Sequence, residues 1–406
     1  MKVLYLHQYF NTPDMKGGTR SYEMAKRMVE QGHEVHIITS RRDSGLETEF
    51  WSKEVVDGII VHWLPVAYNN TMSYRQRVKS FFRFALKAGK KAISIGGDII
   101  FATSTPLTIA IPAVKAKKRL GVPMVFEVRD LWPELPIAMG ALKLPFSKYF
   151  ARKLERYAYF NADHIIGLSP GMTQGVLAAG YPSERVSTIP NSCDLDVFGI
   201  PRSAAKCFRE ERQWLGDRPL VLYAGTLGKI NGVSWLADLA SNVLFRNEEV
   251  RFLVLGEGGD ESGVRRRAEE LGVLGRNFFM EKRISKKDVP KALQAADICM
   301  SLFVPLKAME ANSANKFFDA LAAGRPIAIN YQGWQKDLIL NNSIGLVLDQ
   351  NDVALSAEKL VSLIGDERRK KIFGENARKL GEREFSRDIL ANKLIKTLTD
   401  VSRKSS

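Results

Sequence analysis

Short runs of apolar and β-branched residues alternate with longer segments of helical periodicity along most of the chain. This alternation is typical of a parallel β-sheet whose strands are connected by crossover helices. The pattern predicts strands in a first series at 2–7, 35–39, 59–64, 98–102, 124–128, 164–168 and 186–189, and in a second series at 220–223, 251–255, 277–280, 298–302, 327–329 and 345–348. We therefore expect an α/β protein built from two doubly wound sheets.

A polar segment at 201–218, bounded by prolines, separates the two series and is expected to be a domain linker. The chain has 406 residues, which is too long for a single ordinary core. We expect Rossmann-like domains at 1–200 and 218–385, with the helix at 386–406 as a candidate to pack back on the first domain. Ligands of such sheets bind beyond the carboxyl ends of the strands, so two domains facing across a cleft would share one ligand site.

The composition fits a soluble globular protein, with 45% apolar and 26% charged residues. No apolar run reaches the roughly 18 residues of a membrane span, and the N-terminus reads as a strand rather than as a signal peptide. The three cysteines are scattered, so neither a disulfide framework nor a zinc site is expected, and the chain should work in a reducing cytoplasm. A net charge of +15, spread over both halves, predicts an anionic partner such as a nucleotide, a phospholipid or a nucleic acid.

The segment with the most specific chemistry is 314–326, which reads ANKFFDALAAGRP. A polar turn that ends with Asn315 leads into a helix that carries Lys316 and Asp319 in its first turns and ends in Gly324 and Pro326. The start of a helix exposes unpaired N–H groups and the positive end of its dipole, so it suits a phosphate. An acid about one turn further in can reach a ribose diol. An ordinary amphipathic helix with a good stop signal is the alternative.

A glycine pair, Gly17 and Gly18, follows the first predicted strand, and Arg20 comes in the first turn of the next helix. Glycines at this place let the backbone approach a phosphate closely, and the arginine adds positive charge. A turn without any ligand is the alternative. We regard these three residues as candidates for nucleotide binding.

A second glycine-containing turn, at 223–232, follows the first strand of the second series and reads YAGTLGKING. Gly225 supplies flexible backbone, and Thr226 and Lys229 supply a hydroxyl and a cation suited to a diphosphate. The turn lacks the Walker spacing and is not GxGxxG, so neither a P-loop nor a dinucleotide fold is expected. Arg283 lies just past the third strand of this series, where a nucleobase would lie, although a solvated basic pair with its neighbour is the alternative.

A buried strand runs directly into a charged turn at 127–134, which reads EVRDLWPE. Charged groups at the mouth of a parallel sheet are costly unless water or a ligand solvates them. A site role for Arg129, Asp130 and Glu134 is therefore favoured over a structural ion pair. Asp130 and Glu134, together with Lys229, are our candidate catalytic residues.

The glycine pair, the DLWP turn, IPNSCDLDVF at 189–198 and NKFFDALAAG at 315–324, in this order, resemble glycosyltransferases of family 4. The resemblance spans nearly the whole chain. The DLWP turn and GGTRSYE at 17–23 are especially similar to bacterial enzymes of O-antigen and capsule assembly. The resemblance implies the GT-B fold and transfer of a sugar from a nucleotide donor with retention of configuration, without a metal or another cofactor.

The resemblance also implies roles for individual residues on the donor side. Asp319 would bind the donor ribose, and the backbone of Asn315 and Lys316, with the Lys229 side chain, would hold the diphosphate. Gly18 would contact the phosphate from the other domain.

Asp130 stands where many relatives place a histidine or an aspartate near the anomeric carbon of the donor sugar. The chain also departs from the family pattern. The first of two paired acids aligns with Ala311, and Glu310 is one place away. The usual arginine and lysine of the phosphate loop align with Thr226 and Asn231.

The segment 75–93 carries seven basic residues and no acidic ones. A helical wheel gathers its apolar residues on one face, namely Val78, Phe81, Phe82, Ala85, Leu86 and Ile93. Most lysines and arginines lie opposite, and Phe84 falls among them. The pattern predicts an in-plane helix on an anionic membrane surface. A domain helix that packs its apolar face on the sheet and solvates its basic back is the alternative.

The sequence therefore predicts a retaining glycosyltransferase for lipopolysaccharide, O-antigen or capsule assembly, peripheral at the inner face of the cytoplasmic membrane. Its expected donor is a UDP-linked hexose or N-acetylated sugar, and its expected acceptor is a saccharide on a polyprenyl diphosphate. One alternative is a non-hydrolysing nucleotide-sugar epimerase of the same fold. Another is a basic, non-catalytic adaptor on a membrane or nucleic acid, although no nucleic-acid-binding module is recognised.

Overall fold

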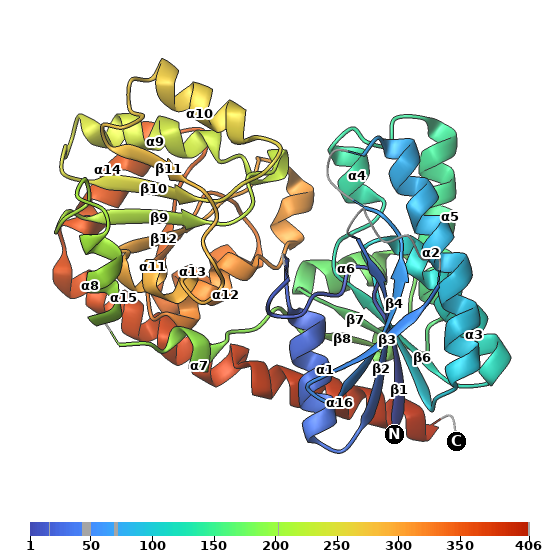
Figure 1. The fold of residues 1–406 in the computed structure, drawn as a ribbon. Helices are drawn as coiled ribbons and strands as arrows, with labels where there is room; N and C mark the ends of the chain where they lie inside the picture. Colours follow the sequence, from blue (N-terminus) through green and yellow to red (C-terminus); the bar gives the residue numbers. More distant parts are fainter. Residues whose placement is uncertain (16, 43–49, 69–71, 202, 405–406) are drawn as a thin grey trace. The chain divides into compact units, whose positions relative to one another are not determined.

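The computed structural model describes residues 1–406 apart from 16, 43–49, 69–71, 202 and 405–406. The chain forms two units, of which one comprises Met1–Pro190 with Asp388–Ser406 and the other comprises Asn191–Arg387. Each unit has its own sheet and its own covering helices, coloured by sequence in Figure 1. The N-terminal part of the first unit thus runs to Pro190, whereas the sequence pattern predicts a boundary at residue 200.

The sheet of the first unit has eight strands in the order β3-β4-β2-β1-β5-β6-β7-β8. Their bounds are β1 (Lys2–Leu6), β2 (Glu34–Arg41), β3 (Ser52–Val56), β4 (Ile59–Pro65), β5 (Ile99–Thr103), β6 (Met124–Val128), β7 (His164–Gly167) and β8 (Val186–Thr188). All neighbouring pairs are parallel except β3 with β4. The seven parallel strands are those that the apolar runs predict.

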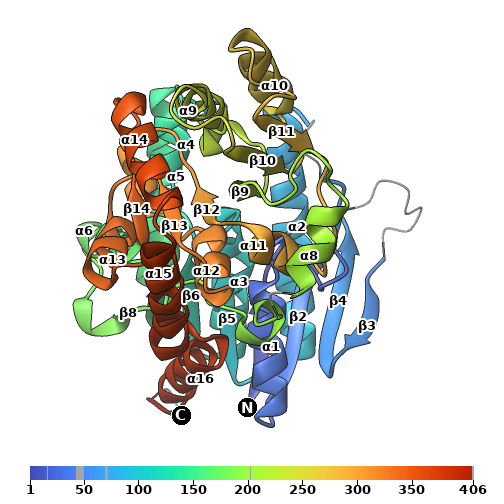
Figure 2. The same cartoon turned by 90° about the vertical axis from the view of Figure 1, so that its left-hand side faces the viewer.

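Strand β3 is not predicted by the sequence pattern. It pairs antiparallel with β4 at the edge of the sheet, as Figure 2 shows. Four of its five residues are exposed, and Val55 is 64% exposed. An edge strand with solvent on both faces has no alternation of apolar and polar residues, so periodicity gives no signal for it.

Helices cover both faces of this sheet. Their bounds are α1 (Arg20–Glu30), α2 (Tyr74–Ile95), η1 (Leu107–Ile109), α3 (Ala110–Leu120), α4 (Glu134–Ala138), α5 (Pro145–Asn161), α6 (Pro170–Ala178), η2 (Ser183–Arg185) and α16 (Arg387–Lys404). α3 contacts both α2 and α5 on one face, and α1 lies on the other (Figure 1). This placement follows from right-handed crossovers between parallel strands.

The last helix, α16, belongs to the first unit from Asp388 onward. Arg27 of α1 donates to the Asp388 carboxylate at 2.6 Å, and Gln31 of α1 donates to Asn392 at 2.6 Å. Lys393 donates to the carbonyl of Thr188 at the end of β8 at 2.9 Å. Side chains of α1 and the end of β8 thus bind α16 to its unit.

The sheet of the second unit has six parallel strands in the order β11-β10-β9-β12-β13-β14. Their bounds are β9 (Leu220–Ala224), β10 (Arg251–Leu255), β11 (Phe278–Glu281), β12 (Ile298–Ser301), β13 (Ile327–Ile329) and β14 (Gly345–Val347). The helices are α7 (Leu195–Phe198), α8 (Ser203–Glu210), η3 (Lys229–Asn231), α9 (Ser234–Leu244), α10 (Glu261–Glu270), α11 (Val289–Ala295), η4 (Lys307–Ala311), α12 (Asn315–Ala322), α13 (Trp334–Asn342), α14 (Val353–Ile364), α15 (Glu367–Leu380) and the π-helix η5 (Gly381–Phe385). The strand series predicted for this half is observed throughout.

The segment 201–218, expected to be a domain linker, belongs to the second unit. It contains α8, which packs on α11. Ala205 and Phe208 of α8 are buried, and Arg209 donates to the carbonyl of Ala295 at the end of α11 at 2.5 Å. A short helix with few apolar residues joins the second unit because its arginine satisfies the carbonyl end of a neighbouring helix.

Helix α2 packs into the first unit partly with the predicted apolar face, where Ala85 is buried, and partly with Phe84, which the helical wheel places on the basic side. Phe84 and Ala88 are fully buried, and the helix contacts α3 over much of its length. The placement of Phe84 on the basic, outward side is therefore wrong. Phe84, Ala88 and Ala92 are spaced four residues apart, so they share one buried face, on which the Phe84 ring fills space and the two alanines let a neighbouring helix approach closely. Phe82 and Leu86 remain exposed on the outer side.

Phe84→Ala is expected to lower the free energy of unfolding of the first unit by about 3–5 kcal/mol, because it removes a fully buried ring. Urea denaturation followed by tyrosine and tryptophan fluorescence measures this loss. Phe82→Ala is the matched control on the same helix, and its effect should stay within about 0.5 kcal/mol. Equal losses in the two variants would contradict the observed orientation of α2.

Candidate functional site

Two glycine turns pack against each other at the carboxyl ends of β9 and β10. A Cβ atom at Gly256 would lie 1.9 Å from the carbonyl oxygen of Gly225, so the two backbones touch. A Cβ atom at Gly225 would lie 2.1 Å from Cε of Lys316. Only glycine at position 225 leaves room for the lysine side chain, and the structure thus brings two of the predicted site residues together.

Lys316 and Asp319 lie on α12 and line one small cavity, together with Leu222 and Ala224 of β9. The Lys316 ammonium is 5.1 Å from the ring centroid of Tyr223, a cation–π distance. Both charged side chains are half-buried. Burial lowers the pKa of Lys316 to about 8, although the charge of Asp319 opposes this shift.

Burial also raises the pKa of Asp319 to about 7, although the charges of Arg387 and Lys316 oppose this shift. In both residues burial is thus the strongest influence on the charge. Ionisable groups with pKa values displaced toward neutrality gather at ligand and catalytic sites more often than elsewhere. Lys316 and Asp319 are therefore the best supported pair of the candidate site.

The first turn of α12 is available to an anion. Ala314 at its N-cap offers no side-chain acceptor, so the cap leaves N–H groups of this turn unpaired by any side chain. Asn315 at the first position is exposed. The preceding Ser313 turns toward Asn191, whose N–H donates to its hydroxyl at 3.2 Å. The arrangement suits a phosphate above the helix start.

Thr226, Lys229 and Arg283 are exposed on turns that leave the carboxyl ends of β9 and β11. Lys229 begins η3, and this turn ends at Gly232, whose φ of +56° favours glycine. The three side chains are thus on the same edge of the sheet as Gly225. Lys316 touches Gly225, whereas Thr226, Lys229 and Arg283 point into solvent.

The position of the missing family acid lies at the end of η4, a short turn before α12. Ala311 ends η4, and Glu310 next to it is half-buried. A Cβ atom at Gly333, which has a φ of +97°, would lie 2.2 Å from the carbonyl oxygen of Glu310. Trp334 donates its indole N–H to the carbonyl of Asn312 at 2.8 Å. The start of α13 therefore fixes the backbone of this segment.

In the first unit, a hydrogen bond within the loop after β1 holds the glycine pair in place. Asn11 donates to the carbonyl of Gly18 at 3.2 Å, and its acceptor oxygen receives a hydrogen bond from Arg42. Gly17 has a φ of +125°, and a Cβ atom there would lie 2.5 Å from the Asn11 amide. Both glycines are exposed. Their backbone is therefore accessible at the carboxyl edge of the sheet.

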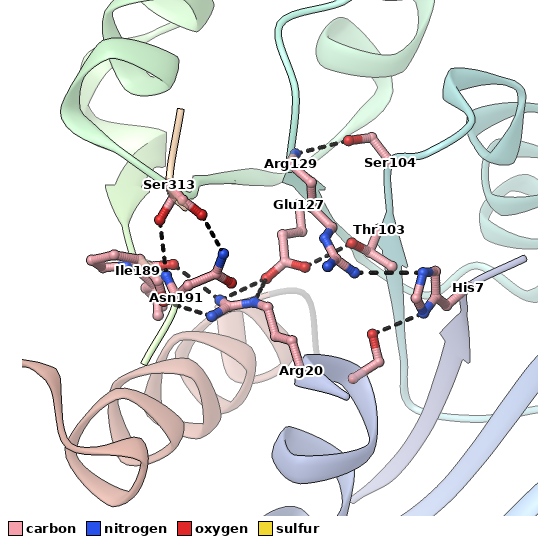
Figure 3. A network of polar contacts seen from close by, with 11 residues as sticks. His7, Arg20, Thr103, Ser104, Glu127, Arg129, Ile189, Asn191 and Ser313 are labelled. Carbon is pink, nitrogen blue, oxygen red and sulfur yellow. Dashed lines mark hydrogen bonds and ion pairs between the residues drawn. The ribbon is translucent and has the colours of Figure 1, made fainter. Parts of the chain in front are cut away.

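Arg20 has a different environment from the one its position predicts. Its side chain is 4% exposed, and it donates to the Glu127 carboxylate at 2.9 and 3.1 Å. It also donates to the carbonyls of Ile189 and Pro190 (Figure 3). Acceptors of the protein itself thus take the hydrogen bonds of the Arg20 guanidinium. The sequence pattern, in contrast, predicts that this group contacts a ligand.

Glu127 at the end of β6 is fully buried. Burial opposes its ionisation, but the charges of Arg20 and Arg129 and hydrogen bonds from Thr103 and Arg20 outweigh this effect, so the pKa of its carboxyl lies below its usual value. The Thr103 hydroxyl donates to it at 2.7 Å. A buried carboxylate is tolerated when an opposite charge balances it and its oxygens accept hydrogen bonds.

Asp130 lies two residues past β6 and is half-buried. The Thr105 hydroxyl donates to its carboxylate at 3.2 Å. Burial raises its pKa, although the charge of Arg129 opposes this shift. Glu134 differs, because it is exposed in the first turn of α4 and forms a 3.4 Å ion pair with Arg152. Of the two candidate catalytic carboxylates, Asp130 is thus the more buried, and Glu134 faces solvent.

His7 is a polar residue of this edge that the sequence pattern does not select. It follows β1 directly and is buried, with Nδ1 at 2.9 Å from the Ser21 hydroxyl and Nε2 at 3.5 Å from Arg129 (Figure 3). Burial and the charges of Arg129 and Arg42 hold its pKa well below the usual value, so the ring is neutral. Its place immediately after the first strand is the signal that could have identified it.

Comparison with known proteins supports an enzyme class for this arrangement. A model of the "Glycosyl transferase 4-like domain" matches residues 17–192, and a model of "Glycosyl transferases group 1" matches residues 206–380. The two matches follow the two units in order. The chain therefore belongs to glycosyltransferase family 4 and has the GT-B fold.

Relatives of the chain include proteins named for the biosynthesis of colanic acid and capsular polysaccharide. The chain is 23% identical over 354 residues to the putative colanic acid biosynthesis glycosyl transferase WcaI of Escherichia coli, covering 82% of this chain and 84% of the relative. It is 23% identical over 371 residues to the capsular polysaccharide biosynthesis glycosyltransferase CapM of Staphylococcus aureus, covering 89% and 88%. The structure of HepE from Anabaena with UDP and glucose superposes with a TM-score of 0.73 at 16% identity, covering 98% of this chain and 100% of that chain, which supports the fold.

Glu127→Gln is expected to lower the free energy of unfolding of the first unit by about 3–5 kcal/mol, because it leaves the buried Arg20 charge without its counterion. Urea denaturation measures the loss. Glu134→Gln breaks the exposed ion pair with Arg152 and should cost less than about 1 kcal/mol. A Glu127 variant as stable as the Glu134 variant would show that the buried pair contributes no more than an exposed one.

Proposed function

We propose that the chain is a retaining glycosyltransferase that transfers a hexose or an N-acetylated sugar from a UDP-linked donor to a lipid-linked saccharide in surface polysaccharide biosynthesis. The proposal of a nucleotide-linked donor is supported by the placement of Lys316 and Asp319 beside the glycine turn that follows β9. The polysaccharide part is supported by the colanic acid and capsule relatives.

The donor is proposed to bind at the carboxyl edge of the second sheet. The Asp319 carboxylate would accept hydrogen bonds from the ribose hydroxyls, which lie one helical turn past the anion site of α12. Lys316 and Lys229 would neutralise the diphosphate, and the N–H groups at the start of α12 would hold it. Arg283 is proposed to lie near the base.

The transfer itself is proposed to need neither a protein nucleophile nor a metal ion. The bond between the anomeric carbon and the diphosphate oxygen breaks, and a bond to the acceptor hydroxyl oxygen forms on the same face. The leaving diphosphate takes the proton of that hydroxyl. Lys316 and Lys229 would stabilise the charge that develops on it, and Asp130 and Glu134 are proposed to lie near the transferred sugar.

The acceptor is proposed to be a saccharide on a polyprenyl diphosphate at the inner face of the cytoplasmic membrane. No helix in the described part of the chain is both long and apolar enough to cross a bilayer. The outer side of α2 exposes Lys79, Arg83 and Lys90. Such a basic side would attract anionic head groups, with about 1 kcal/mol for each cation near the surface.

Calorimetric titration with UDP, GDP, ADP and CMP, first without metal and then with magnesium, tests the donor assignment. UDP is expected to bind without metal and more tightly than the other three nucleotides. Preferential binding of GDP would refute the choice of base. Binding only in the presence of magnesium would refute the metal-independent mechanism. Interconversion of free donor sugars without an acceptor would favour the epimerase.

Asp319→Asn is expected to weaken UDP binding about 10- to 100-fold at pH 7.5, since charge-assisted hydrogen bonds contribute about 1.5–3 kcal/mol. The carboxylate has a pKa of about 7, so the affinity of the unmodified chain should rise as the pH rises through 7. Lys316 has a pKa of about 8, so the affinity should fall again as the pH rises through 8. Titrations between pH 6 and pH 9 measure both changes.

The control for this series is Asp337→Asn, which removes an exposed carboxylate from the first turn of α13 in the same unit. It should leave the affinity and its pH profile unchanged. The nucleotide's own ionisation is the same in every titration and cancels between variants. An acid-side loss of affinity that persists in Asp319→Asn would show that another group titrates.

A further inference from the structure

Helix α5 presents an aromatic stripe to solvent. It consists of five aromatic residues whose side chains are exposed to these fractions: Phe146 78%, Tyr149 61%, Phe150 62%, Tyr157 37% and Phe160 48%. Their spacing places all five within a narrow sector of the helix surface. Leu144, just before the helix, is 70% exposed and extends the stripe at its N-terminal end. We call these six residues the α5 stripe.

The opposite side of α5 already packs against the unit. Ala158 and Tyr159 are buried, and the Tyr159 ring lies 6.4 Å from that of Phe126 in β6. The helix also contacts α3 and η1. The α5 stripe is therefore a second apolar side of the helix, separate from the side that forms the core.

The α5 stripe is more apolar than the basic side of α2. On α2, Phe82 and Leu86 are the large apolar residues with high exposure, at 45% and 64%. Scattered apolar side chains are normal on a protein surface, but a contiguous aromatic patch marks an interaction site. If one of the two helices inserts side chains into an apolar phase, α5 is the better candidate.

Positive charge lies beside and within the α5 stripe. Arg152 and Arg156 are exposed along one side of it, Lys153 is exposed between Phe150 and Tyr157, and Lys143 precedes the helix. The Arg156 guanidinium lies 4.8 Å from the Phe160 ring centroid. Arg152 also pairs with Glu134 at 3.4 Å. The single acid of α5, Glu155, is half-buried on the inner side, and burial raises its pKa to about 7.

We propose that the α5 stripe inserts into the interface of an anionic lipid bilayer, where its rings reach the boundary of the acyl chains and Arg152, Lys153 and Arg156 meet lipid phosphates. A bilayer supplies both the apolar phase and the negative charge that this surface lacks. A second copy of the chain would bring an identical basic flank against this one, which is unfavourable. Long basic side chains beside the rings can extend to the head groups.

This inference adds to the proposed function the surface through which a lipid-linked acceptor would be approached. It rests on that function only for the nature of the acceptor. Donor binding in the second unit and lipid binding through α5 are separate measurements. Either assignment can fail while the other holds.

The test is co-sedimentation of the full chain with vesicles of phosphatidylglycerol and phosphatidylcholine, and with vesicles of phosphatidylcholine alone. The unaltered chain should bind the anionic vesicles and bind the neutral ones weakly. The double variant Phe146→Ser and Phe150→Ser should lose about tenfold or more of its binding to anionic vesicles, since two exposed rings no longer enter the interface. Its UDP affinity and its urea midpoint should be unchanged, because both side chains lie outside the core.

The matched control is Phe82→Ser and Leu86→Ser, which removes the exposed apolar pair of α2 and leaves its cations in place. It should keep anionic vesicle binding within about twofold. Loss of binding in this control with full binding in the α5 variant would place the inserted surface on α2. Equal binding to both kinds of vesicle would overturn the role of the basic flank. A dimer that the α5 variant converts to a monomer, without lipid binding, would identify a contact between copies.

Discussion

The buried ion pair between Arg20 and Glu127 is the constraint on which the first unit depends. Glu127 ends a central strand, where a carboxylate removed from water is costly unless both its charge and its oxygens are matched. Arg20, from the start of α1, matches the charge, and Thr103 at the end of β5 supplies a further donor. The remaining guanidinium donors reach the carbonyls of Ile189 and Pro190. One pair thus fixes two strand ends, a helix start and the point where the chain leaves the unit.

The charged pair of the candidate site in the second unit differs from this buried ion pair. Lys316 and Asp319 are half-buried, and burial shifts both pKa values toward neutrality instead of strengthening the charges. In Glu127 the surrounding donors outweigh burial, and the pKa falls. The contrast separates the two kinds of site on physical grounds. A buried charge that the protein itself satisfies holds the fold, whereas a charge left incompletely satisfied is available to a ligand, here proposed to be a nucleotide sugar.

Of the fourteen strands in the described part of the chain, the sequence predicts thirteen, because buried parallel strands are continuous apolar runs whatever their neighbours. It misses β3, whose exposed residues carry no periodicity, and α8, whose few apolar residues lie in a polar segment. The motifs mark Gly225 and Lys316 separately as candidates for nucleotide binding, and the fold brings the lysine side chain against the glycine. It cannot foresee that Arg20 is satisfied internally, because its partner Glu127 is more than a hundred residues away and their pairing arises only from the order of the strands.

Helices α2 and α5 show why a helical wheel alone does not locate a surface. A wheel groups the apolar residues of a helix, but it does not say which group faces the core. In α2 packing selects Phe84 with two alanines, and in α5 it selects Ala158 and Tyr159. The aromatic residues left outside α5 then form a second apolar side. A helix with two apolar sides needs two environments other than water, and the core supplies only one of them. The basic flank of the other side favours a lipid surface as the second.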